Sequence, residues 1–215
     1  MKLASKNVLY SASILPVVAA HLIVEAYCDA KPIVPVHHPK RIKFANESKP
    51  FTVHVTKYVC TETPYNESEL LQCKTILRRN KPALFNISVH VPIVLNTFFF
   101  EVKTYYRLND YQQFPAEIHT EVCSYFRHPS EDILSRHIMS VMFETVPHLM
   151  YYCPHGNTTY HAAFWIEDRF FPKSMPAGDF RMDVRFRTVR NITILAYRIY
   201  FSVRRQGIWK SLIEW

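Results

Sequence analysis

The stretch FRMDVRFRT, residues 180–188, decides the fold class. Its apolar residues stand at every second position: Phe180, Met182, Val184 and Phe186. The positions between them are polar: Arg181, Asp183, Arg185 and Arg187. Side chains of a strand point alternately to its two faces, so this pattern predicts a strand with one buried and one wet face. Such one-sided strands are typical of antiparallel sheets.

Five further segments are predicted to be strands. They span residues 51–60, 84–91, 98–108, 160–168 and 192–203. In the first, Phe51, Val53 and Val55 alternate with polar residues. In the second, Phe85, Ile87, Val89 and Val91 share the inner face. In the third, Phe98, Phe100 and Val102 share the inner face. In the last, the inward set is Thr193, Leu195, Tyr197, Ile199, Phe201 and Val203.

One helix is predicted from Glu131 to Thr145, with Ser130 as its N-cap. Its apolar stripe contains Ile133, Leu134, His137, Ile138, Val141 and Met142. We expect His137 to be a half-buried packing residue, and Pro147 to stop the helix.

The predicted fold class is mainly β: a two-sheet antiparallel β-sandwich, immunoglobulin-like in its layers, with one α-helix tethered by a disulfide. The sandwich is expected to span residues 51–205. Residues 31–50 form a proline-rich, extended lead-in, and residues 206–215 form a C-terminal tail.

Residues 1–30 have the layout of a secretory signal peptide. Lys2 and Lys6 precede an apolar run, and small residues follow it, so cleavage is expected after Ala26 or Ala30. An uncleaved membrane anchor is the competing interpretation, but the run is short for a span and contains Pro16 and His21. The protein is therefore expected to be secreted and extracellular.

Five Asn-x-Ser/Thr sequons support secretion, because chance predicts about one in this composition. They begin at Asn46, Asn66, Asn86, Asn157 and Asn191. Each is a glycan acceptor only in the secretory pathway.

Cleavage after Ala30 removes Cys28 and leaves an even number of cysteines, as suits a secreted disulfide framework. They are Cys60, Cys73, Cys123 and Cys153. Four cysteines allow three pairings, of which we favour Cys60–Cys73 and Cys123–Cys153. Cys153 is then half of a bridge and not a reactive thiolate. His155, two residues later, is expected to be a turn residue.

Catalytic motifs are missing from the sequence. It contains three glycines, Gly156, Gly178 and Gly207, and no phosphate-binding loop, no nucleophile elbow and no His-Glu-x-x-His helix. The adjacent His37 and His38 lack further ligands at metal-site spacing. We therefore expect no enzymatic activity, no metal and no cofactor. The net charge of +8 suits anionic surfaces, and nucleic acid is not an expected partner outside the cell.

The chain is rich in aromatic residues, with 15 Phe and 13 Tyr. On inward strand faces they either fill a packed core or line an apolar ligand pocket between the sheets. The pocket candidates are Phe98, Phe100, Phe164, Phe180, Phe186, Tyr197 and Phe201.

The order of these segments resembles a family of small secreted insect proteins known as domain of unknown function 1091. The resemblance rests on the run VHVTKYVCTET, the segment from Cys123 to Phe126, Cys153-Pro154, and the turn with Pro176, Gly178 and Phe180. His155 and Phe180 stand where the family often has tyrosine. The resemblance implies kinship with insect chemosensory accessory proteins and, more distantly, with ML-type lipid-recognition domains such as the ganglioside activator. It implies a β-sandwich with an apolar pocket and supplies no catalytic residues.

Two functions follow as expectations. The first is a secreted, non-enzymatic carrier or presenter of a small hydrophobic ligand, lipid or pheromone-like, acting near a membrane receptor or another extracellular protein. The alternative is a secreted protein–protein interaction module with a packed core. Its recognition face would be basic, built from Arg181, Arg185, Arg187, Arg204 and Arg205.

Overall fold

The computed structural model describes residues 41–45 and 48–206. Contacts divide the chain into the units Met1–Val36 and His37–Trp215, and every described residue lies in the second unit. The expected signal peptide, Cys28, the Asn46 sequon and residues 207–215 of the expected tail lie outside the described residues.

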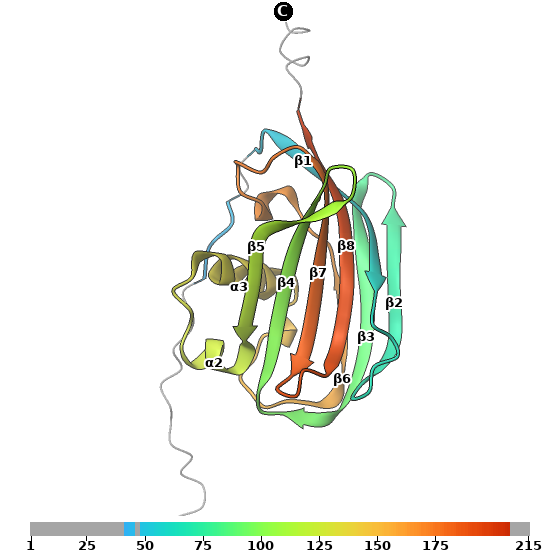
Figure 1. The fold of residues 1–215 in the computed structure, drawn as a ribbon, viewed down its shortest axis with the longest axis vertical. Helices are drawn as coiled ribbons and strands as arrows, with labels where there is room; N and C mark the ends of the chain where they lie inside the picture. Colours follow the sequence, from blue (N-terminus) through green and yellow to red (C-terminus); the bar gives the residue numbers. More distant parts are fainter. Residues whose placement is uncertain (1–40, 46–47, 207–215) are drawn as a thin grey trace, which may run out of the picture. The chain divides into compact units, whose positions relative to one another are not determined.

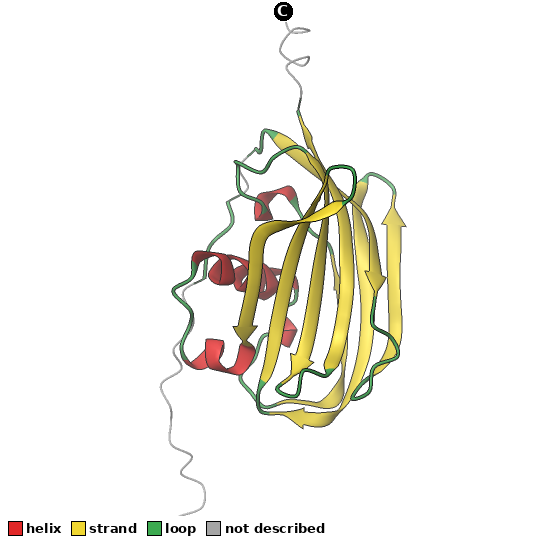
Figure 2. Cartoon of the chain, in the orientation of Figure 1, coloured by secondary structure: helices red, strands yellow, loops and turns green. Residues whose placement is uncertain are grey.

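Two antiparallel sheets make up most of the described chain (Figures 1 and 2). The larger sheet has the strand order β1-β8-β7-β4-β5, and the smaller sheet has the order β2-β3-β6. The bounds are β1 Phe51–Cys60, β2 Glu69–Arg78, β3 Lys81–Leu95, β4 Phe98–Arg107, β5 Tyr111–Glu121, β6 His155–Phe164, β7 Gly178–Thr188 and β8 Thr193–Arg205. The predicted fold class, a mainly β protein with two antiparallel sheets, is confirmed.

The alternation read from the sequence sets which side of each strand faces the other sheet. In β7, Phe180 and Val184 are buried, and in β4 Phe98, Phe100 and Val102 are buried. In β3, which belongs to the smaller sheet, the apolar residues of the inner face are also buried: Phe85, Ile87, Val89 and Val91. Because these two inner faces meet, the apolar side chains form one core between the sheets.

In two strands a register irregularity changes which residues face inward, and the orientation predicted from alternation is wrong at those positions. In β1 the irregularity lies between Val55 and Lys57, and Tyr58 is buried instead of continuing the exposed row. In β8 the inward position assigned to Thr193 is wrong. Between Phe186 and Arg187 the pairing of β7 with β8 shifts by one residue, which turns Thr193 outward, where its hydroxyl accepts from Arg185. An inserted residue reverses the faces of a strand.

Strands β6 and β3 differ most from their predicted bounds. Residues 160–168 were expected to be one strand, but β6 begins at His155 and ends at Phe164. A 3₁₀ turn, η2, follows at Asp168–Phe170. β3 runs through Pro92, which is exposed, and the pairing with β6 skips between Val91 and Val94 at that point. A proline is accommodated at such an irregularity because it has no N–H to donate to the ladder.

Strands β2 and β5 were not predicted. β5 contains Pro115 and few apolar residues, and β2 is an edge strand whose burial does not alternate cleanly. Their pairing partners, β4 and β3, determine that they are strands.

The predicted single helix is joined by a second, shorter one. Helix α3 spans Ile133–Thr145, with Asp132 and not Ser130 as its N-cap: the Asp132 carboxylate accepts from the Ser135 N–H at 2.6 Å. Helix α2, Val122–Arg127, was not predicted and is capped by Glu121. A 3₁₀ turn, η1, covers Pro147–Leu149 after α3. Figure 1 shows α3 beside β5, at that edge of the larger sheet.

The two disulfides have the pairing that the sequence favoured. Cys60–Cys73 joins β1 to β2, one strand of each sheet. Cys123–Cys153 joins α2 to the segment just before β6. Helix α3 lies within the loop that this bridge closes, but neither cysteine is part of α3.

Candidate functional site: an apolar cavity between the sheets

A cavity of about 280 Å³ lies between the sheets, beside α3. Its walls come from β3 and β6 on one side and from β4, β5, β7 and β8 on the other. Helix α3 contributes Leu134, His137, Ile138, Val141, Met142 and Thr145. Phe170, Phe171, Pro172 and Met175, in and after η2, complete the lining. Elements that are distant in sequence therefore share one apolar space.

The lining is almost wholly apolar, and no Asp, Glu, Lys or Arg of the described residues belongs to it. Its polar residues are Thr104, His137, Thr145, Tyr160 and Tyr197. Such a composition is typical of ligand pockets, which are mostly apolar with a few placed polar groups.

Three of these polar groups are already bonded to the protein. The Thr145 hydroxyl donates to the Val141 carbonyl at 2.9 Å. His137 Nε2 lies 2.6 Å from the Phe170 carbonyl oxygen, which only accepts, so this nitrogen carries the proton. The Tyr160 hydroxyl lies 3.0 Å from the Tyr151 hydroxyl. His137 is partly buried, as expected, but it is also part of the cavity wall.

Five of the seven aromatic residues proposed from the sequence line the cavity: Phe100, Phe164, Phe186, Tyr197 and Phe201. The other two assignments are corrected. Phe180 is fully buried beside Phe201, its pairing partner on β8, with ring centroids 5.3 Å apart, and it is not part of the lining. Phe98 lies at the start of β4 and packs on the His155 ring, away from the cavity. Alternation tells which face a side chain occupies but not how deep along the sandwich it lies.

The sequence analysis missed the contribution of α3 to the cavity. The signal was present, because the apolar stripe of the predicted helix contains the residues that line the wall. An apolar stripe predicts that one face of a helix is buried. Only the three-dimensional arrangement shows that part of this face borders the cavity.

His155 is not the turn residue that the sequence suggested. It begins β6 and is 7% exposed. Its ring stacks on Tyr151 with centroids 4.0 Å apart, and Nε2 donates to the Tyr151 carbonyl at 3.0 Å. Burial lowers the pKa of His155, and the hydrogen bond to the Tyr151 carbonyl opposes that shift. Its contacts are therefore structural.

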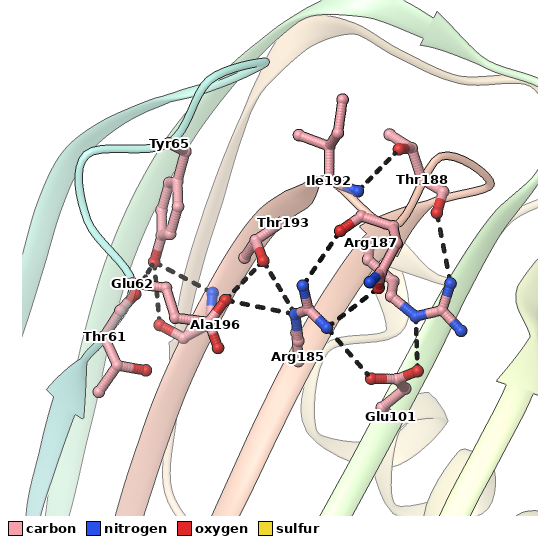
Figure 3. Close-up of polar contacts among 11 residues, drawn as sticks. Thr61, Glu62, Tyr65, Glu101, Arg185, Arg187, Thr188, Ile192, Thr193 and Ala196 are labelled. Atoms are coloured by element: carbon pink, nitrogen blue, oxygen red, sulfur yellow. Dashed lines mark hydrogen bonds and ion pairs between the residues drawn. The ribbon is translucent and has the colours of Figure 1, made fainter.

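The proposed basic row on β7 is neutralised by carboxylates, as Figure 3 shows at one end of the sheet. Glu101 of β4 lies 2.5 Å from Arg187 Nε and 3.8 Å from Arg185. Arg185 also lies 3.3 Å from Glu62 and donates to the Thr193 hydroxyl at 2.8 Å. These side chains are largely covered, with 28% of Arg185 and 14% of Arg187 exposed.

The remaining arginines of the row are also engaged. Arg181 lies 2.8 Å from Asp183, and its guanidinium stacks over Tyr105 at 3.9 Å. Arg204 lies 2.6 Å from Asp179. Arg205 donates to the Met175 carbonyl at 3.3 Å. Four of the five arginines of this row are thus ion-paired, and Arg205 donates to a backbone carbonyl.

Three described sequon asparagines are exposed: Asn66, Asn157 and Asn191. Asn86 is half-buried on the outer face of β3, and Ser88, which completes its sequon, is only 4% exposed. The Asn191 side chain accepts from Arg185 through its oxygen, which leaves the amide nitrogen facing away from that bond. The accessibility of Asn86 is therefore lower than its outward strand position suggested.

Two features are absent from the described residues. No group of three or more His, Cys, Asp and Glu side chains is arranged to hold a metal ion. Among the described helices, none has the length and apolar character needed to cross a membrane.

Comparison with known proteins supports the resemblance seen in the sequence. A family model described as "Protein of unknown function (DUF1091)" matches residues 100–182. The resemblance is thereby confirmed from β4 to the middle of β7. No curated protein matches the chain.

Solved structures that resemble the chain include the following two. One is a Niemann-Pick type C2 protein from Japanese carpenter ant, 14% identical, with a TM-score of 0.32, covering 66% of this chain and 96% of that one. Another is chicken MD-1 complexed with lipid IVa, 14% identical, with a TM-score of 0.29, covering 72% of this chain and 98% of that one. Neither likeness is close enough to say what this chain binds.

Proposed function

We propose that this chain is a secreted, non-enzymatic binding protein that carries or presents a small hydrophobic ligand in the cavity between its sheets. The observation that carries the proposal is the cavity itself: about 280 Å³ lined by aromatic and aliphatic side chains, with no charged residue among the described residues that line it. A packed core has few voids larger than a water molecule, so a space of this size requires an explanation.

The volume suits a lipid-like molecule. An engineered apolar cavity of about 150 Å³ stays dry and binds benzene, and this cavity is larger. Water gains little there, because each buried water needs two to four polar partners and three of the five polar lining residues already bond to the protein. An apolar ligand restores the dispersion contacts that the empty lining lacks.

Secretion is part of the proposal and has its own support. The two disulfides are typical of proteins that fold in an oxidising compartment. Three of the sequon asparagines are exposed. A receptor or another extracellular protein that takes up or senses the ligand is the partner class that fits this role.

The alternative, an interaction module with a basic recognition face, has less support. A partner that binds the arginine row has to displace Glu101 and Asp183, which already neutralise it. Breaking a half-buried ion pair costs desolvation and Coulomb energy that the new contact must replace.

A matched pair of substitutions tests the carrier proposal. Ala162 lines the cavity and is 7% exposed, whereas its neighbour Ala163 is exposed on the opposite face of β6. Ala162→Leu places three extra carbons into the cavity, and Ala163→Leu places them in solvent. Binding is measured with the neutral fluorophore N-phenyl-1-naphthylamine, beside mass spectrometry of an organic extract of the purified glycoprotein.

We expect Ala162→Leu to weaken fluorophore binding at least tenfold, and Ala163→Leu to leave it unchanged. If the space is real, Ala162→Leu also escapes the destabilisation of about 1–3 kcal/mol that overpacking a filled core causes. A wild-type protein that binds neither the fluorophore nor any extractable lipid refutes the carrier function. In that case loss of a partner on Arg185→Glu becomes the test of the alternative.

A further inference from the structure

Two hydroxyl groups of the cavity lining have no hydrogen-bond partner among the described residues. They belong to Thr104 on β4 and Tyr197 on β8. Their two positions are separated across the larger sheet, because Thr104 pairs with Met182 of β7, whereas Tyr197 pairs with Val184. Unpaired polar groups in an apolar interior are costly and uncommon, so each requires an explanation.

The Tyr197 end of the cavity holds a second phenol that also lacks a partner. Tyr58 of β1 is 4% exposed, and its hydroxyl is buried without a hydrogen bond. Tyr58 pairs with Ile199 and Cys60 pairs with Tyr197, which makes the two tyrosines diagonal neighbours on the same inward face. Tyr58 stacks on Phe85, with centroids 4.6 Å apart, and the Phe85 ring lies 5.1 Å from Tyr197.

This end of the cavity therefore contains a cluster of packed aromatic rings, two of which carry a hydroxyl group. Tyr197 belongs to the lining, together with Phe164 and Ile166, and Tyr58 is a buried core residue that is not part of the lining. The backbone amide of Ile166 lies near the Tyr58 hydroxyl and partly opposes the rise in the Tyr58 pKa that burial causes. The geometry of this contact is not that of a hydrogen bond, so the Tyr58 hydroxyl has no partner among the described residues.

Both phenols stay neutral in the pH range of an extracellular fluid. Burial raises the pKa of Tyr197, and the electrostatic interaction with Tyr58 raises it further. Burial likewise raises the pKa of Tyr58. A neutral phenol donates one hydrogen bond and accepts others, so it satisfies a hydroxyl, ester, ketone or aldehyde oxygen.

Charged ligands fit this site poorly. A carboxylate or ammonium group buried without a partner of opposite charge carries a large desolvation cost, and the lining contains no Asp, Glu, Lys or Arg. His137, the one titratable base of the lining, already donates its Nε2 proton to the Phe170 carbonyl.

We propose that the hydroxyl of Tyr197 is the polar anchor of the cavity, and that the ligand is a neutral lipid with a single oxygen function at one end, such as a fatty alcohol or a fatty ester. This inference rests on the proposed carrier function and specifies its ligand class. The alkyl chain of the ligand fills the apolar cavity, while its oxygen bonds to the otherwise unpaired phenol.

The test uses the full-length glycoprotein and four twelve-carbon probes: dodecane, dodecan-1-ol, methyl dodecanoate and dodecanoic acid. Each displaces bound N-phenyl-1-naphthylamine, with the acid measured at a pH where it is ionised. The variants are Tyr197→Phe, which removes only the hydroxyl from a retained ring, and Thr104→Val, which removes the other unpaired hydroxyl of the lining. Circular dichroism and thermal unfolding confirm that both variants are folded.

We expect the wild type to bind the alcohol and the ester more tightly than dodecane or the ionised acid. Tyr197→Phe is expected to weaken alcohol and ester binding about two- to tenfold, the effect of one neutral hydrogen bond, and to leave dodecane unchanged. Thr104→Val is expected to leave all four unchanged.

Three results overturn the anchor. In the first, the wild type binds dodecane as tightly as the alcohol. In the second, Thr104→Val, and not Tyr197→Phe, causes the selective loss. In the third, the ionised acid binds best. In each of these the carrier function stands, and either the anchor residue or the ligand class is wrong. Failure of the wild type to bind any probe, the fluorophore included, overturns both.

Discussion

Removing the two disulfides separately is expected to destabilise the protein to different extents. The double variant Cys123→Ala/Cys153→Ala opens a loop with a sequence separation of 30, and Cys60→Ala/Cys73→Ala opens one of 13. In the chain-entropy model a bridge stabilises by restricting the unfolded chain, more so for a longer loop. For these separations the model gives about 3.6 and about 2.9 kcal/mol at 25 °C.

Burial increases the difference. Cys123 is only 1% exposed and packs in the core, while Cys60 and Cys73 are half-buried. Replacing the Cys123 sulfur by hydrogen leaves a gap in that core, whose cost adds to the entropic one. We therefore expect the Cys123/Cys153 variant to be the less stable of the two by about 1 kcal/mol or more.

Urea unfolding followed by circular dichroism measures both variants against the wild type. Slopes of about 1–3 kcal/mol per molar urea turn the expected losses into midpoint shifts of about 1 M or more. The reasoning fails if the Cys60/Cys73 variant is destabilised as much as the other, or if either variant keeps the wild-type midpoint.

Two further predictions concern the segment after the second bridge. Because the buried His155 holds its proton more weakly than the unfolded chain, its contribution to stability is present above its ordinary pKa of 6.5 and is lost as the pH falls below it. His155→Gln should flatten the dependence of the unfolding free energy on pH below about 6.5, and an unchanged slope would contradict the assignment. Gly156 has φ +85°, and a Cβ there would collide with the Ile93 carbonyl oxygen, so Gly156→Ala should destabilise by roughly 2 kcal/mol or more. The exposed Thr158→Ala is the control in thermal unfolding, and equal melting temperatures would show that the glycine is not required.

The sequence by itself determined the local features of this protein. Alternation in β4 and β7 fixes which side chains point inward, because the two-residue period of a strand is a property of the backbone alone. The apolar stripe of α3 predicts the helix for the same reason, since its period is local. The resemblance to the family of unknown function could also be read from motifs, and the family model confirms it over residues 100–182.

The tertiary structure alone decided the depth and the partners of those side chains. Phe180 and Phe186 share one strand face, yet Phe186 lines the cavity and Phe180 packs beside Phe201 outside the lining, because the elements packed above each position differ. The arginines of β7 looked like a free basic face until Glu101, 86 residues from Arg187 in the chain, was found beside them. Pairing at such separations follows from strand order, which a local pattern does not contain.

The anchor at Tyr197 shows the same division most clearly. Its inward orientation followed from the alternation of β8, and its place among the aromatic candidates followed from that orientation. That its hydroxyl has no partner among the described residues, and that Tyr58 lies diagonally beside it, depends on a register irregularity in β1 and on the empty space between the sheets. The sequence specifies a tyrosine whose ring points inward. Only the packing of distant strands decides whether the hydroxyl of that tyrosine bonds to the protein or faces a ligand.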